Sequence, residues 1–233
     1  MEADQRNARI FGVLFLITFV TSIPALALFQ PVLDDPAAYI AGGGHDSQIS
    51  LGVLLELLLI IANVATAVVI YPILRRQSEI LSLGYVTARL VECMFIAAGI
   101  IFVLGIVSLR QDDPGSSALA VSFAALKDWT FLLGPGFIVG WGNGLILAYL
   151  MYRSRLVPRS MAWLGLIGGP LIILSGIGVL FDVWDAGSTV QALATIPEFL
   201  WELSLGIYCA VKGFRRDSPI FSPAARLRQQ ESA

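Results

Sequence analysis

The sequence predicts an all-α fold: a polytopic transmembrane helical bundle of six spans, with the N and C termini in the cytoplasm. Of its residues, 57% are hydrophobic and 14% are charged, whereas a soluble domain is about half apolar and about a quarter charged. The apolar residues come in blocks of about 20, the length of helix that crosses a hydrocarbon core about 30 Å thick. Strands of a membrane barrel would instead alternate over about ten residues, so the blocks predict helices.

Six apolar blocks follow one another, separated by charged or turn-forming stretches. Their approximate limits are 10–29, 49–74, 83–109, 130–152, 161–181 and 190–211. Basic residues before the first block and the small residues at 25–27 resemble a signal peptide, but the apolar run is longer than most signal cores, so we expect a span. We expect residues 1–214 to form a single six-helix domain and residues 215–233 to form a polar cytoplasmic tail.

The distribution of basic residues predicts the orientation. Arg110 and Lys127 are the flanking cations on one side of the predicted membrane, and aspartates gather with them. The cations of the other side are Arg6, Arg9, Arg75, Arg76, Arg153, Arg155, Arg159, Lys212, Arg215, Arg216, Arg226 and Arg228. Because Lys and Arg accumulate on the cytoplasmic side, this second side is predicted to be cytoplasmic. The expected location is a cell membrane, crossed several times: a bacterial inner membrane or a plasma membrane.

Polar residues inside the apolar blocks mark the candidate site. They are Glu56, Asn63, Arg89, Glu92, Glu198 and Glu202. A charge at the centre of a span costs at least about 2.5–3.5 kcal/mol, so these side chains are expected to face the bundle interior or a water-filled cavity.

Helical spacing and depth suggest partners for these charges. Arg89 is three residues before Glu92 and therefore on the same face, so we expect it to pair with Glu92 or Glu202. Glu56 and Glu198 fall at a similar depth and form a plausible carboxylate pair. With four carboxylates against one guanidinium, we expect some of the glutamates to be protonated. The cluster is then a proton or cation site, or a pocket for a substrate headgroup; the alternative is an interhelical clamp of hydrogen-bonded polar groups.

The fourth block is rich in glycine. Gly136, Gly140 and Gly144 recur every fourth residue, a pattern that lets a neighbouring helix approach closely. The alternative is a broken helix that exposes backbone groups to a cavity, as in transporters. Lys127 and Trp129, just before this block, are expected to be an interfacial anchor.

Several classes of function are disfavoured. A net charge of −2 gives no reason to expect nucleic acid. Cys93, Cys209 and the single histidine, His45, do not form a metal-ligand pattern, so we expect no metal and no cofactor. No phosphate-binding loop, dinucleotide fingerprint or hydrolase motif occurs. These absences disfavour an enzyme without excluding an acid–base enzyme built on glutamate.

Three segments carry a family resemblance. The run 149–159 (YLMYRSRLVPR), the last span from Pro197-Glu198 to Gly213-Phe214, and Arg89-x-x-Glu92 resemble the bacterial domain of unknown function family 4386. The resemblance implies a bacterial integral membrane protein of about six spans. It implies no activity.

Three hypotheses for function remain open. The first is a small transporter-like or ligand-binding protein whose partners are the lipid bilayer and a small molecule or proton. The second is a non-catalytic structural or regulatory membrane protein in which the buried charges are a clamp. The third is a lipid-modifying enzyme. Small-residue faces also make an oligomer possible. A polar cavity that reaches the charges would favour the first hypothesis, and a dry core with every group paired would favour the second.

Overall fold

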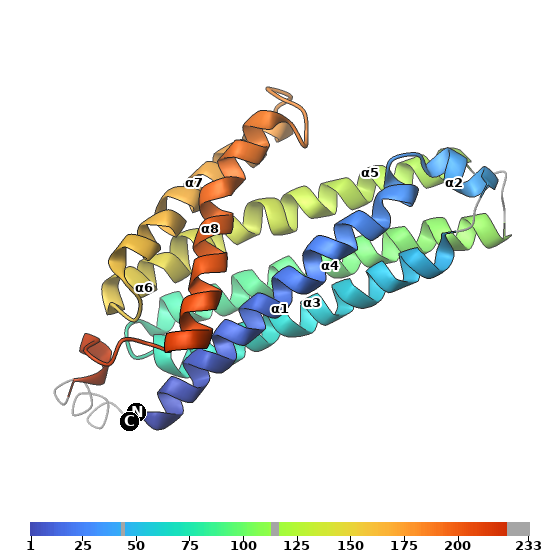
Figure 1. The fold of residues 1–233 in the computed structure, drawn as a ribbon. Coiled ribbons are helices and arrows are strands. Elements are labelled where there is room, and N and C mark those ends of the chain that lie inside the picture. The colour runs from blue at the N-terminus through green and yellow to red at the C-terminus, as the bar shows by residue number, and fades with distance from the viewer. Residues whose placement is uncertain (43–44, 113–116, 223–233) are drawn as a thin grey trace.

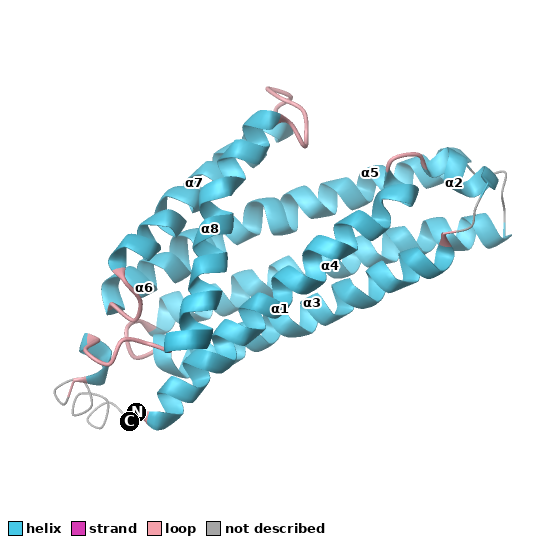
Figure 2. Ribbon diagram, viewed as in Figure 1, coloured by secondary structure: helices cyan, strands magenta, loops and turns pink. Residues whose placement is uncertain are grey.

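The computed structural model describes residues 1–42, 45–112 and 117–222, and all regular secondary structure in these ranges is helical (Figure 2). The predicted all-α class is therefore confirmed. The elements are α1 (Glu2–Leu33), α2 (Pro36–Gly42), α3 (Asp46–Leu74), α4 (Glu79–Asp112), α5 (Ser117–Leu133), η1 (Gly134–Ile138), η2 (Gly140–Leu147), α6 (Ala148–Ser154), α7 (Arg159–Leu180), α8 (Thr189–Lys212) and η3 (Pro219–Phe221).

Five helical segments of the described residues are long and apolar enough to cross a membrane. They are α1, α3, α4, the continuous segment Ser117–Ser154, and α7. The chain is thus a multi-pass membrane protein by length and composition. α1 and α4 have 32 and 34 residues, more than the ~20 that a bilayer core needs, so their charged ends extend past the apolar blocks. α8 is not among the five, and it carries two glutamates within its apolar sequence.

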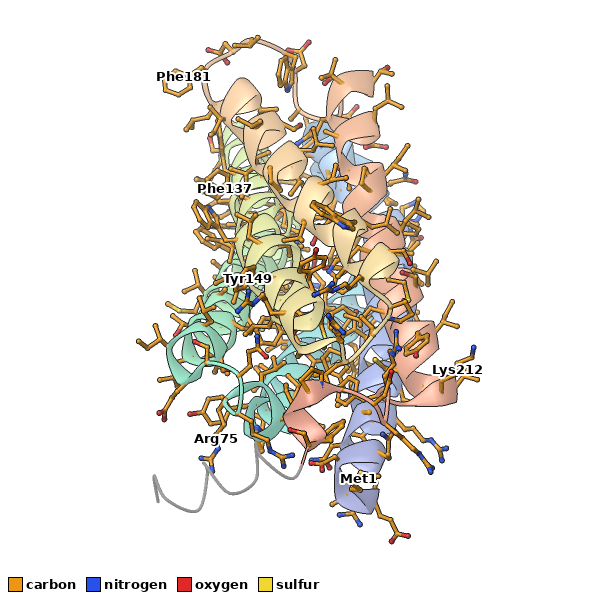
Figure 3. All side chains as sticks on the ribbon, turned by 90° about the vertical axis from the view of Figure 1, so that its left-hand side faces the viewer. Met1, Arg75, Phe137, Tyr149, Phe181 and Lys212 are labelled. Carbon is orange, nitrogen blue, oxygen red and sulfur yellow. The ribbon has the colours of Figure 1, made fainter. Side chains whose placement is uncertain are left out.

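The long helices form a closed ring. α1 packs between α8 and α3, α4 packs between α3 and α5, and α7 packs between η2 and α8. Figure 1 shows that α7 and α8 form a hairpin that diverges from the other helices toward its connecting loop. Met1, Arg75 and Lys212 lie at one end of the bundle and Phe181 at the other (Figure 3). We call these the Met1 end and the Phe181 end.

The segment after α8 packs onto the Met1 end. Ser218 Oγ donates a hydrogen bond to the carbonyl of Ser154 (2.6 Å), and the Arg215 N–H donates to the carbonyl of Leu156 (2.9 Å). Phe214 and Phe221 are buried in the adjacent core. The expected polar tail is thus packed against the bundle as far as Ser222, because its Ile220 and Phe221 belong to the same core cluster as Leu156 and Val157 of the α6–α7 loop. Residues 223–233 of that prediction lie outside the described residues.

Two apolar clusters form the core. The cluster at the Met1 end includes Phe11, Tyr85 and Trp201. The cluster at the other end includes Phe29 and Val103. Asn63 of α3 and Arg89 and Glu92 of α4 lie between residues of the two clusters, and the corresponding stretch of α1 has the buried Thr18 and Thr21.

The glycine-rich segment is a wide, π-helical stretch packed on α7. A Cβ atom at Gly140 would lie 2.6 Å from Ile172 Cγ2, and one at Gly144 would overlap Gly169. Close packing therefore occurs at Gly140 and Gly144, within the bundle. Gly136 differs, since its nearest neighbour would be 3.4 Å away, an ordinary contact. The segment is also irregular, as the alternative of a broken helix required, because its turns are π-helical. Such turns are frequent near functional sites.

Candidate functional site

A cavity of about 180 Å³ lies between the two core clusters. Residues of α1, α3, α4, α5, η1, α7 and α8 line it. All six residues singled out from the sequence line it: Glu56, Asn63, Arg89, Glu92, Glu198 and Glu202. The ring of helices thus brings to one place polar groups that are up to 146 positions apart in the chain.

Arg89, Glu92 and Asn63 form a closed hydrogen-bonded triangle. Arg89 Nη1 donates to Glu92 Oε2 at 2.7 Å, and Arg89 Nη2 donates to Asn63 Oδ1 at 2.5 Å. Asn63 Nδ2 completes the triangle by donating to Glu92 Oε1 at 3.1 Å. All three side chains are buried. Of the two partners expected for Arg89, the structure pairs it with Glu92 on the same helix, and the bonds of both to Asn63 join α4 to α3.

Lys127 is a second buried cation, which the sequence analysis placed at the membrane interface. Its Nζ atom lies 2.6 Å from Glu56 Oε1 and 5.0 Å from the centre of the Phe29 ring. Glu56 is thus paired with Lys127. The predicted pairing of Glu56 with Glu198 is wrong. The reason is that the helix begins at Ser117, so Lys127 lies more than two turns inside it. The apolar run from Ala118 to Leu126 was the sequence signal for this earlier start.

Glu202 is held by a residue that the sequence analysis did not select. Asn143 Nδ2 donates a hydrogen bond to Glu202 Oε1, and the carbonyl of Asn143 accepts one from Trp201 Nε1 at 3.0 Å. Asn143 is fully buried in η2. The cost of placing a polar side chain inside an apolar span, which identified Asn63, applies equally to Asn143.

Glu198 is buried without a hydrogen-bond partner. Its side chain is 2% exposed, and neither carboxyl oxygen has a partner in the described part of the chain. The carboxyl group lies over Gly144 and Gly168, where a Cβ atom on Gly168 would come within 2.8 Å of Glu198 Oε2. These two glycines leave the space that the carboxyl group occupies between η2, α7 and α8.

The charges around the cavity divide into two sets. Arg89 pairs with Glu92 and Lys127 pairs with Glu56, so the charges on the α3–α4–α5 side of the cavity cancel. Glu198 and Glu202, one helical turn apart on α8, have no cation within salt-bridge distance among the described residues. We call the first set the neutral wall and the second the acidic wall. The imbalance is two carboxylates, smaller than the sequence suggested, because Lys127 compensates Glu56.

A second cavity adjoins the first toward the Phe181 end. It has a volume of about 380 Å³ and lies between η1 and α8. Both cavities are lined by Phe131, Pro135, Ile172, Thr195 and Phe199, and the second extends to Gly187 and Gln191 beside the α7–α8 loop. The acidic wall thus lines the inner of two adjacent cavities, and the outer one lies toward that end of the bundle.

Comparison with protein families identifies the family of this chain. The model of a family described as Domain of unknown function (DUF4386) matches residues 10–213. The chain belongs to this family. The resemblance seen in the sequence is thereby confirmed, and the DUF4386 match includes every residue that lines the two cavities. No curated protein and no solved structure matches the chain.

The chemistry available in this DUF4386 chain is that of carboxyl groups. In the described ranges, no three His, Cys, Asp or Glu side chains are placed to share a metal ion. Cys93 and Cys209 are both buried as free thiols. The acidic wall can accept and release protons or hold a cation, and the neutral wall can hydrogen-bond a polar ligand.

Proposed function

We propose that this chain is a small transporter-like membrane protein that binds a proton or a small ligand at Glu198 and Glu202. The observation that carries the proposal is Glu198, a buried carboxyl group with no partner that lines a cavity. An isolated charge in the membrane interior costs several kcal/mol, so Glu198 rests as the neutral acid. It ionises when a ligand or water compensates its charge. Intramembrane carboxyl groups of this kind mark proton and ion pathways.

We also propose that α8 is a sixth span and that both termini are cytoplasmic, in a bacterial cell membrane. α8 runs beside α7 and α1 and closes the ring. Its C-terminal end and the N terminus lie at the same end of the bundle (Figure 3). Most of the Lys and Arg residues that flank the helices are on loops or termini of that end, which supports a cytoplasmic assignment.

A structural role is the second candidate for part of the cluster. Arg89 pairs with Glu92 within α4 and both bind Asn63 of α3, while Lys127 of α5 pairs with Glu56 of α3. That is the arrangement of an interhelical clamp. The clamp accounts for the neutral wall and leaves Glu198 unexplained, which is why we place binding on the acidic wall.

Labelling with dicyclohexylcarbodiimide tests the proposal, because this apolar reagent modifies protonated carboxyl groups in apolar surroundings. We expect an adduct on Glu198, located by mass spectrometry, whose yield falls as the pH is raised. Glu198→Gln should lose the adduct and keep the fold. Glu56 and Glu92 serve as internal controls, because their cation partners keep them ionised and unreactive. Absence of any adduct on Glu198 from acidic to alkaline pH would exclude the proposed proton site.

A further inference from the structure

The path to Glu198 is apolar and partly open to the surroundings of the bundle. Phe131 and Phe199 line both cavities, yet these residues are 43% and 41% exposed, respectively. On a membrane-spanning bundle, such exposed rings face lipid chains. A ligand that follows this path must therefore move along apolar surface between η1 and α8 before it meets the carboxyl group.

The charges of the cavity select the sign of the ligand. Arg89 and Lys127 each form an ion pair with a buried carboxylate, so neither positive charge is uncompensated, although Arg89 Nε has no hydrogen-bond partner in the described part of the chain. The acidic wall has two carboxyl groups and no cation. Phe131 and Phe199 also present aromatic rings, which attract cations over their faces. An anionic ligand would meet uncompensated carboxyl groups, whereas a monocation would neutralise one of them.

We propose that Glu198 binds an organic ammonium ion that carries an apolar substituent, in exchange for the proton of its carboxyl group. The inference rests on the proposed function, since it needs Glu198 to be a proton-exchanging group. The ammonium head lies against Glu198 in the inner cavity, and the apolar substituent fills the outer cavity between Phe131 and Phe199. The carboxyl O–H bond breaks, the proton goes to solvent, and the ammonium charge replaces it. One proton is released for each monocation bound, so the cavity keeps the same net charge.

Calorimetry with benzyltrimethylammonium tests the proposal on the purified protein in lipid nanodiscs. Titrations in two buffers of different ionisation enthalpy count the protons released. We expect about one proton per bound cation, and an affinity that rises about tenfold per pH unit while Glu198 is protonated in the free protein. Tetramethylammonium, which lacks the apolar group, should bind at least tenfold more weakly, and phenylacetate should not bind.

Matched variants locate the site. Glu198→Gln should abolish binding and proton release while keeping the melting temperature, because Glu198 makes no hydrogen bond that the amide would lose. Glu79→Gln, an exposed carboxyl at the start of α4, should bind like the wild type. Phe199→Ala should weaken benzyltrimethylammonium several-fold. Unchanged binding by Glu198→Gln, binding without proton release, or equal binding of phenylacetate would each overturn the proposal.

Carbodiimide labelling and a change of lipid composition distinguish failure of the ammonium inference from failure of the proposed function, and a lipid headgroup from a free amine. If carbodiimide labels Glu198 in a pH-dependent way and the cation neither binds nor protects against labelling, the proposed function stands and the ammonium inference fails. If neither labelling nor binding occurs, both fail. Nanodiscs with and without phosphatidylethanolamine distinguish the source of the ammonium group. Competition by that lipid identifies a headgroup as the ligand, and no competition identifies a free amine.

Discussion

The Nζ atom of Lys127 lies 2.6 Å from Oε1 of Glu56 in the interior of the bundle, where 3% of the lysine surface is exposed. The pair joins α5 to α3, as Arg89 and Glu92 with Asn63 join α4 to α3. Both buried cations are thereby used on one side of the cavity. The carboxyl groups that lack a cation are both on α8, and this asymmetry is the basis of the functional proposal.

Removing the Lys127 charge should be costly. Lys127→Met leaves Glu56 buried without its cation, and breaking such a pair typically costs about 3–5 kcal/mol. The double variant with Glu56→Gln should recover much of the loss, measured as the unfolding temperature in detergent. Lys212→Met, on an exposed lysine at the end of α8, is the control and should change stability by less than about 0.5 kcal/mol. A Lys127→Met variant as stable as wild type would contradict the buried pair.

A double-mutant cycle should detect coupling between Arg89 and Glu92. Each of Arg89→Ala and Glu92→Gln removes one partner of the 2.7 Å ion pair. Their combination should be more stable than the sum of the two losses predicts, by about 1 kcal/mol or more. Denaturant titration of the three variants and the wild type supplies the four free energies of unfolding. Strict additivity would mean that the pair has no energetic role.

The glycines of the π-helical stretch should respond unequally to alanine. Gly144→Ala places a methyl group on the backbone of Gly169, and overpacking of this kind costs about 1–3 kcal/mol. Gly136→Ala meets only ordinary contacts and should be nearly neutral. The yield of monodisperse protein on size exclusion compares the two variants. Equal yields would argue against close packing of η2 on α7.

Alkaline pH should weaken the Phe181 end through Tyr39. Burial, together with the nearby Asp46 carboxylate that accepts its hydroxyl proton at 2.5 Å, raises the pKa of Tyr39 to about 12. The folded protein therefore holds this proton more tightly than the unfolded chain, so its contribution to stability is complete below about pH 10 and is lost as the pH rises toward 12. Melting temperatures of wild type and Tyr39→Phe should converge over that window. A constant difference between them would refute the assignment.

The polar cluster was largely predictable because of the energetic cost of charge in lipid. Glu56, Arg89 and Glu198 stand out in apolar blocks, and that cost alone directs them to the interior. Their partners were less predictable. The pairing of Glu56 depends on where α5 begins and on which helices are neighbours in the ring, and neither follows from the composition of a block.

The glycine-rich segment shows a different limit. Its sequence is compatible both with close helix packing and with an irregular helix, and both features are present at Gly140 and Gly144. Packing on α7 selects the outcome, so local sequence left it open. The packed segment around Phe221 was missed for a similar reason, since Ile220 and Phe221 are its only two large apolar residues before Ser222, and their burial depends on the neighbouring core cluster.

The position of α8 in the ring has a consequence for biosynthesis. α8 is the last long helix to be synthesised, and it closes the ring between α7 and α1. The cations of α4 and α5 have their carboxylate partners on α4 and α3, all of which precede α8 in the chain. An insertion intermediate that lacks α8 therefore contains the partners of both buried cations, and it needs no residue of α8 to neutralise Arg89 or Lys127. Glu198 and Glu202 then join a bundle in which both buried cations already have carboxylate partners on earlier helices.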